Sequence, residues 1–209
     1  MVNEVHGSRR ERKKADARRR ILDAAVRLFG ERGIEAVTVD EIAAAADVAK
    51  GSIYSHHRTK EDIVVAFLLD LEARVQQKAA RITDDSLPAA EVLSRFIATQ
   101  FRLKAPHHKF VRVFLGEMMT RTADFLPALV AMQQVTDPPL VKLFENLRDR
   151  GAIRGDVPLD QLLLVFKSMH LGLTAMWAVE GPPFRTTYRT LAAEMRVFCE
   201  GLAPERKRR

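Results

Sequence analysis

The sequence predicts an all-α protein of about nine helices. Almost every segment of the 209 residues places its apolar side chains three and four positions apart, the period of a helix with one buried face. Helix-ending signals, mostly Gly and Pro, recur between these segments, and nothing reads as a ladder of alternating strands. Hydrophobic residues make up 47% of the chain, which is enough to build a core around such helices.

The N-terminal part of the chain predicts four helices in quick succession. They cover about residues 15–32, 38–46, 50–56 and 59–82. Gly33 ends the first helix, and Thr38 with Glu41 has the form of a capping box that opens the second. Thr59 can cap the fourth, with Asp62 in its first turn beside the positive end of the helix dipole.

The remainder of the chain predicts longer helices separated by breaks. The expected boundaries fall at residues 83–86, 124–127, 150–155 and 181–183. Pro88, Pro106 and Pro158 each suit the start of a helix. Residues 137–139, Asp-Pro-Pro, are expected to break or bend their helix, and the last helix should cover residues 187–200.

Composition excludes several classes of protein. Cys199 is the one cysteine, so an intramolecular disulfide and a cysteine metal cluster are excluded, and a reduced cytoplasm is expected. The basic N-terminus lacks the apolar segment of a secretory signal. Residues 161–179 come closest to a membrane span, but Lys167 and His170 near the middle favour a buried helix and no membrane partner. The 34 Lys and Arg against 27 Asp and Glu favour an anionic partner.

Residues 38–63, TVDEIAAAADVAKGSIYSHHRTKEDI, predict two short helices that cross at a tight turn. A helix that enters the DNA major groove is held in this way across a second helix. Ile42, Val48 and Ile53 supply the apolar inner faces, and Ala43 is small enough for the crossing point. Asp47 occupies the turn, where a residue that tolerates positive φ is needed.

The outer face of the second of these helices carries short donors and an aromatic side chain. These residues are Lys50, Ser52, Tyr54, Ser55 and His56. Gly51 lets a partner's backbone approach, and Lys60 brings a cation to a helix start where a phosphate could dock. The pattern predicts contact with DNA; ordinary surface polarity is the alternative for each residue.

The same stretch resembles the DNA-binding domain of the TetR family of bacterial transcriptional regulators. The matching positions are Thr38, Val39, Ile42, Ala43, Ala46, Val48, Ala49, Gly51, Ile53, Tyr54, His56, Lys60 and Glu61, and residues 15–37 resemble the family's first helix. The chain departs from the family at Asp47, where glycine is usual, and at His57, where the family buries phenylalanine.

The resemblance implies a role for each residue of this face. Thr38, Ser52, Tyr54, His56 and Lys60 would hold phosphates, and Lys50, Gly51 and Ser55 would lie nearest the base edges. Phosphate contacts fix the register on DNA, whereas base contacts carry sequence information. Since one recognition helix reads few bases, such proteins bind palindromic operators as homodimers.

The last two helices are the expected dimer interface, because the resemblance implies a four-helix bundle between subunits. The candidate contacts are Leu164, Ser168, Leu171, Ala175, Leu191, Met195 and Phe198. Packing of these stripes within one subunit is the alternative.

The helices between these two regions are rich in Phe and Met, and the resemblance implies that they hold a small apolar or amphipathic ligand. The candidate pocket residues are Phe96, Gln100, Phe114, Met118, Met169, His170 and Trp177. Ordinary core packing is the alternative for each of them.

These observations predict a ligand-responsive repressor with four segments: a basic arm (1–14), a DNA-binding domain (15–64, with its helix-turn-helix at 39–58), a ligand-binding and dimerisation domain (65–204) and a basic tail (205–209). The alternatives are an architectural nucleic-acid binder that acts through charge, and an enzyme with an unrecognised site. The common catalytic and phosphate-binding motifs are absent, and neither a cofactor nor a metal site is expected, His56-His57 included.

Overall fold

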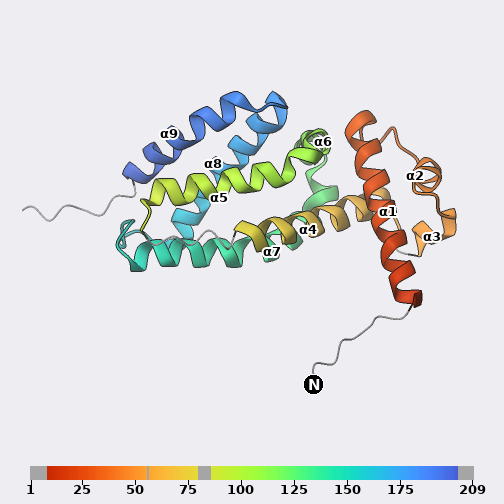
Figure 1. Ribbon diagram of the computed structural model, residues 1–209, viewed down its shortest axis with the longest axis horizontal. Coiled ribbons are helices and arrows are strands. Elements are labelled where there is room, and N and C mark those ends of the chain that lie inside the picture. The colour runs from red at the N-terminus through yellow and green to blue at the C-terminus, as the bar shows by residue number, and fades with distance from the viewer. Residues whose placement is uncertain (1–8, 56, 80–85, 202–209) are drawn as a thin grey trace, which may run out of the picture.

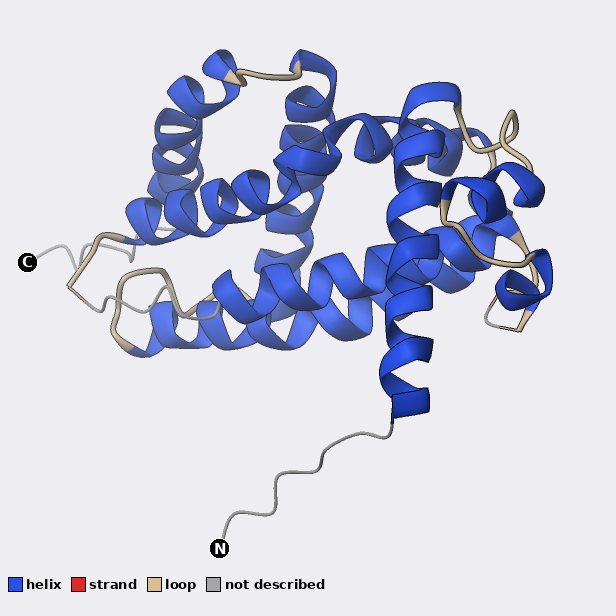
Figure 2. Cartoon of the chain, turned by 45° about the vertical axis from the view of Figure 1, so that its right-hand side comes forward, coloured by secondary structure: helices blue, strands red, loops and turns tan. Residues whose placement is uncertain are grey.

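The computed structural model describes residues 9–55, 57–79 and 86–201, and every regular element within them is a helix (Figure 2). In chain order these are α1 (Arg9–Arg32), α2 (Val39–Ala45), α3 (Lys50–Tyr54), α4 (Lys60–Ala79), α5 (Ala89–Lys104), the 3-10 helix η1 (Ala105–His107), α6 (His108–Thr120), α7 (Thr122–Asp149), α8 (Leu159–Glu180) and α9 (Arg185–Gly201). The predicted all-α class and its nine α-helices are therefore confirmed over the part of the chain that the structure describes.

The helices form a small head and a larger body (Figure 1). The head consists of α1, α2 and α3 with the start of α4, at the right of Figure 1. In the body, α4 packs along α7, α5 packs along α9, and α8 contacts α6, α7 and α9. Because α4 belongs to both parts, a displacement in the body can be carried into the head.

The head and the body share one hydrophobic core. Ile21, Phe29 and Ile42 of the head belong to the same buried cluster as Phe110 and Phe125 of α6 and α7. The crossing of α1 over α6 is close: a Cβ at Gly30 would lie 3.0 Å from the backbone nitrogen of Phe110. The head is thus packed against the body and is not a module on a flexible linker.

Local signals set the turns of the head as the sequence predicted. Thr38 Oγ1 accepts a hydrogen bond from the backbone N–H of Glu41 at 3.2 Å, and the Glu41 carboxylate accepts the N–H of Thr38 at 2.8 Å, which completes the capping box. Asp47 has a φ of 52°, so it occupies the left-handed turn position expected of it. Thr59 Oγ1 accepts the N–H of Asp62 at 3.1 Å and caps α4.

Two predicted boundaries are wrong. α1 begins at Arg9, so residues 9–14 are helical and not part of a flexible arm, in keeping with the helix propensity of Arg and Lys. α7 begins at Thr122 and runs unbroken to Asp149, through the predicted boundary at residues 124–127 and through the prolines at 138 and 139. Packing of α7 along α4 overrides the local preference of these prolines.

A carboxylate closes the turn between the last two helices. Glu180 accepts hydrogen bonds from the backbone N–H groups of Thr186 at 2.6 Å and Thr187 at 2.9 Å, and from the Thr187 hydroxyl at 2.6 Å. The Thr187 hydroxyl and backbone bonds lower the pKa of Glu180 to about 2. The backbone bond from Thr38, assisted by Arg32, likewise lowers the pKa of Glu41 to about 2.

These two carboxylates predict a loss of stability in acid. Both pKa values lie below the ordinary glutamate value of 4.5, so the native state favours the ionised form. The stabilisation is complete above pH 4.5 and is lost as the pH falls toward 2. We expect Glu180→Gln to flatten the fall in urea midpoint between these pH values, whereas Glu145→Gln, an exposed control on α7, should retain the wild-type profile.

Candidate DNA-binding face and effector cavity

The outer face of α3 is open to solvent while its inner face is buried. Ile53 packs in the core of the head, and the adjacent Tyr54 has 50% of its surface exposed. Lys50, Gly51 and Ser55 are exposed as well. An aromatic side chain left outside at the end of a short helix is available to a partner molecule, as the sequence predicted.

Two polar residues of this face have internal partners that are easily exchanged. Lys50 Nζ lies 2.7 Å from Asp40 Oδ1, and this hydrogen bond raises the pKa of Lys50. Ser55 Oγ donates to the backbone carbonyl of Ser52 at 2.8 Å. Because the Lys50–Asp40 pair is exposed on both sides, it is weak enough for Lys50 to turn toward DNA.

Lys60 has an internal role that the sequence did not reveal. Its ammonium donates to the carbonyl oxygens of Ile34 at 3.0 Å and Glu35 at 3.1 Å, which holds the loop between α1 and α2 against the start of α4. One N–H of the ammonium remains for a phosphate. His56 lies outside the described residues, and His57 is buried behind α3, where the family pattern places phenylalanine.

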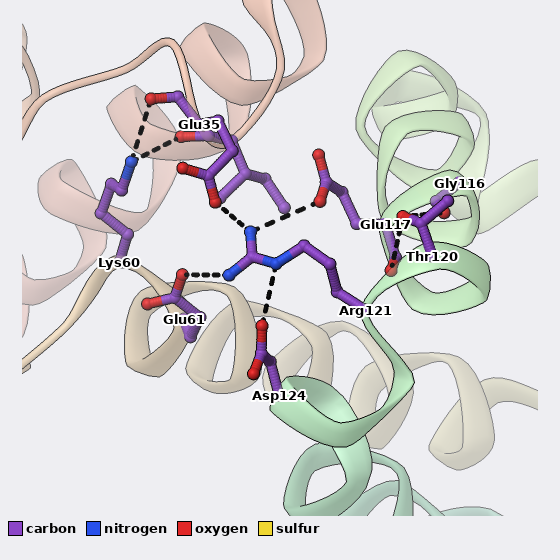
Figure 3. A network of polar contacts seen from close by, with 9 residues as sticks. Glu35, Lys60, Glu61, Gly116, Glu117, Thr120, Arg121 and Asp124 are labelled. Atoms are coloured by element: carbon purple, nitrogen blue, oxygen red, sulfur yellow. Dashed lines mark hydrogen bonds and ion pairs between the residues drawn. The ribbon is translucent and has the colours of Figure 1, made fainter.

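Arg121 joins the head to the body at the junction of α6 and α7 (Figure 3). Its guanidinium pairs with four carboxylates: Glu35 in the α1–α2 loop, Glu61 at 3.4 Å in α4, Glu117 at 3.5 Å in α6 and Asp124 at 2.8 Å in α7. The hydrogen bond to Asp124 and the surrounding negative charge raise the pKa of Arg121. One cation thus neutralises acidic groups on both sides of the junction.

We expect Arg121→Met to loosen this junction. The variant leaves the Glu35 and Glu61 carboxylates of the head without their shared cation, so they repel those of α6 and α7. Amide hydrogen exchange should become faster in the α1–α2 loop and the first turn of α4, and the melting temperature should fall. Arg112→Met, an exposed site on α6, is the matched control and should change neither measurement.

A cavity of about 200 Å³ lies in the body, enclosed by α4, α5, α6, α7 and α8. Five of the predicted pocket residues line it: Phe96, Gln100, Phe114, Met118 and His170. The volume far exceeds the roughly 15 Å³ that a single water requires. The body therefore holds space for a small ligand where the sequence predicted one.

Two predicted pocket residues lie elsewhere. Trp177 is fully buried, with its indole stacked between Phe101 at 5.3 Å and Phe184 at 4.9 Å, so the prediction that it lines the cavity is wrong. Met169 packs against the core of the body outside the cavity lining. It precedes His170 by one residue, a rotation of about 100° around the helix, so it faces another direction.

The cavity also has charged lining that the sequence reading missed. Buried Glu72 of α4 pairs with buried Lys104 of α5 at 2.5 Å, and Asp137 of α7 pairs with Lys167 of α8 at 2.9 Å. Burial, together with the nearby Lys104 cation, lowers the pKa of His170 to about 3, so its imidazole is neutral at physiological pH. A charged residue within the apolar stripe of a helix was the signal available for Glu72 and Lys104.

A broad apolar face of α8 is exposed on the outside of the body. We call it the α8 surface, and it comprises Leu164, Val165, Leu171, Met176 and Val179. α8 has the length and apolar composition of a membrane-spanning helix, yet only 33% of its most apolar window is buried in this chain. The expectation of a buried helix is therefore wrong for a single chain.

The predicted interface residues divide between this surface and the core. Leu164, Ser168 and Leu171 are exposed, and Ala175 is half-buried beside them. Leu191 and Met195 of α9 are buried because that face of α9 packs on α5, so the structure corrects their assignment to a dimer contact. Phe198 is half-buried, with its ring 5.8 Å from that of Phe166.

Within the described residues, no group of three or more His, Cys, Asp and Glu side chains is placed to hold a metal ion. The polar clusters of the head and the cavity are instead paired acids and bases, such as Arg121 with its carboxylates.

Comparison with known proteins identifies the family. The family model for bacterial regulatory proteins of the tetR family matches residues 21–67. The uncharacterized HTH-type transcriptional regulator YhgD of Bacillus subtilis is 26% identical over 170 residues, which cover 80% of this chain and 87% of the relative. That match extends well beyond the head.

Two solved structures share the fold over nearly the whole chain. FadR from Thermus thermophilus, a transcriptional repressor in complex with lauroyl-CoA, has a TM-score of 0.68 and 23% identity, and covers 92% of this chain and 98% of its own. FadR from Bacillus subtilis, in complex with stearoyl-CoA, has a TM-score of 0.70 and 21% identity over 88% and 98% of the two chains. The helix-turn-helix head and the helical body together show that this chain belongs to the TetR family of bacterial transcriptional regulators and is not an enzyme.

Proposed function

We propose that the chain is a cytoplasmic repressor that binds a palindromic operator as a homodimer and releases it when a small amphipathic ligand enters the body. The single observation that carries the proposal is the outer face of α3, where Tyr54 is half exposed while the adjacent Ile53 is buried. Lys50 and Ser55 flank Tyr54 on the same exposed side. By family resemblance, Thr38, Ser52 and Lys60 complete the set of contacts to DNA.

Dimerisation is supported by the α8 surface. It exposes five large apolar side chains on one helix, and Val197 of α9 is exposed as well. An apolar patch of this kind marks a protein contact, and a twofold axis would place one α8 surface against another. We therefore assign residues 65–204 to ligand binding and dimerisation, with Leu164, Ser168, Leu171 and Ala175 at the interface.

Ligand release is supported by the position of α4. This helix of 20 residues, about 30 Å long, begins in the head at Lys60 and lines the cavity through Leu68, Leu71, Glu72 and Gln76. A ligand that displaces its far end would move α3 and spoil the fit to DNA. The two solved relatives bind molecules with long acyl chains, and an apolar chain of this type suits the Phe and Met lining here.

Operator selection from random duplexes tests the proposal. A dimeric repressor should enrich a palindrome and bind it at least about a thousandfold more tightly than random DNA. The alternative, an architectural binder that acts by charge, would bind every duplex alike with an affinity set by salt. Failure to enrich a palindrome at any salt concentration would refute the repressor.

A further inference from the structure

One end of the cavity is polar, and its side chains come in pairs one helical turn apart. The pairs are Glu72 and Gln76 on α4, Gln100 and Lys104 on α5, and His170 and Thr174 on α8. Side chains four residues apart lie on the same face of a helix, so each helix presents two polar groups to the cavity. The remaining lining is mostly apolar and includes Phe96, Phe114 and Met132.

The charges of this lining cancel. Glu72 pairs with Lys104 at 2.5 Å, with both side chains buried, and Asp137 pairs with Lys167 at 2.9 Å. Each cation already has a carboxylate partner, so a ligand carboxylate could be neutralised only by breaking one of these pairs. A buried charge left without a partner is strongly destabilising. The lining therefore disfavours an anionic group inside the cavity.

Two buried polar atoms of the lining have no hydrogen-bond partner in the part of the chain that the structure describes. They are Oε1 of Gln76, whose side chain belongs to a residue only 7% exposed, and Nε2 of His170. Buried polar atoms are nearly always paired in folded proteins, so these two require an explanation. Gln76 Oε1 is an acceptor, and Nε2 of a neutral imidazole either donates or accepts according to the tautomer.

We infer that the effector is an uncharged amphipathic molecule whose buried polar group, a hydroxyl or a carboxamide, donates a hydrogen bond to Gln76 and exchanges a second with His170, while its apolar chain lies against the Phe and Met lining. The inference rests on the proposed function and narrows its ligand. A hydroxyl fits because it donates one hydrogen bond and accepts others. A carboxylate or a thioester has only acceptors and leaves Gln76 Oε1 unpaired.

Calorimetry on the full chain with four ligands of equal chain length tests the inference. The ligands are 1-decanol, decanamide, decanoate at about pH 8, where a carboxylic acid is ionised, and decanoyl-CoA. We expect decanol and decanamide to bind at least about tenfold more tightly than the other two, because only they satisfy Gln76 without bringing in a charge. Tighter binding of decanoate or decanoyl-CoA, or no binding of any of the four, would overturn the inference.

A pair of adjacent glutamines supplies the matched variants. Gln76→Met keeps the side-chain length and removes the unpaired acceptor, so it should weaken decanol binding about tenfold while raising the melting temperature of the ligand-free protein. Gln77 is exposed on the same helix, and Gln77→Met should change neither value. Wild-type affinity for decanol in Gln76→Met would refute the assignment, and the ligand series on the wild-type chain tests it independently of that variant's folding.

Gel shifts with a selected operator separate this inference from the proposed function. If decanol binds in the calorimeter but does not release the operator, the ligand-released repressor fails and the site assignment stands. If only decanoyl-CoA releases the operator, the repressor stands and the inference fails.

Discussion

Replacing Leu164 and Met176 together by glutamate should convert the protein into a monomer and lower its operator affinity by at least about a hundredfold. Both side chains lie on the α8 surface, where they are 65% and 59% exposed in the single chain. In a twofold dimer the double variant would bury four carboxylates without partners, which no apolar contact can offset. A monomer binds one half-site at a time and loses the gain from joining two.

Sedimentation gives the mass of this variant, and a gel shift gives its affinity. Helicity should stay at the wild-type level, because neither side chain belongs to the buried core. Leu126→Glu is the matched control: Leu126 is an equally exposed apolar residue, but it lies on α7, outside the α8 surface. A double variant that sediments as a wild-type dimer would show that subunits meet elsewhere.

The double variant Lys50→Ala with Tyr54→Ala should lose about a hundredfold in operator affinity while the dimer mass and melting temperature remain unchanged. Each dimer would lose four contacts at roughly 0.5–1.5 kcal/mol apiece. Both side chains are exposed, so their removal leaves the core of the head intact. If Lys50 lies at a base edge, as the family resemblance implies, Lys50→Ala alone should relax sequence preference; a phosphate contact would instead reduce the salt dependence uniformly.

Lys60 is unsuitable for this experiment because its ammonium holds the carbonyls of Ile34 and Glu35. Lys60→Ala would disturb the α1–α2 loop, and a weaker gel shift would then have two causes. Lys78→Ala, an exposed lysine at the far end of α4, controls for the loss of one positive charge. If the double variant binds the operator with wild-type affinity, the outer face of α3 is not the DNA contact.

The features that the sequence predicted well are those set by neighbouring residues. Thr38 and Glu41 are three positions apart and determine their own hydrogen bonds, and Asp47 occupies the left-handed turn because the chain reverses there. The course of α7 could not be predicted in this way. Its prolines favour a break locally, but its packing along α4 keeps it helical.

The candidate site was predicted only where a helix has one clearly apolar face. Phe96 and Gln100 follow such a face of α5 and do line the cavity. Leu191 and Met195 follow an equally clear stripe, but a stripe does not say whether it meets its own chain or another. The Arg121 cluster was missed because Arg121 and Glu35 are 86 positions apart, a pairing that only the fold creates.

The unbroken course of α7 has a mechanical consequence. Pro138 and Pro139 carry no backbone N–H, so the carbonyls of Gln134 and Val135 receive no hydrogen bond from the residue four places further on. Thr136 and Asp137, which line the cavity, lie within this weakened turn. The wall is therefore most compliant where it borders the space, and it can bow outward there to admit a guest without rupturing a helical bond.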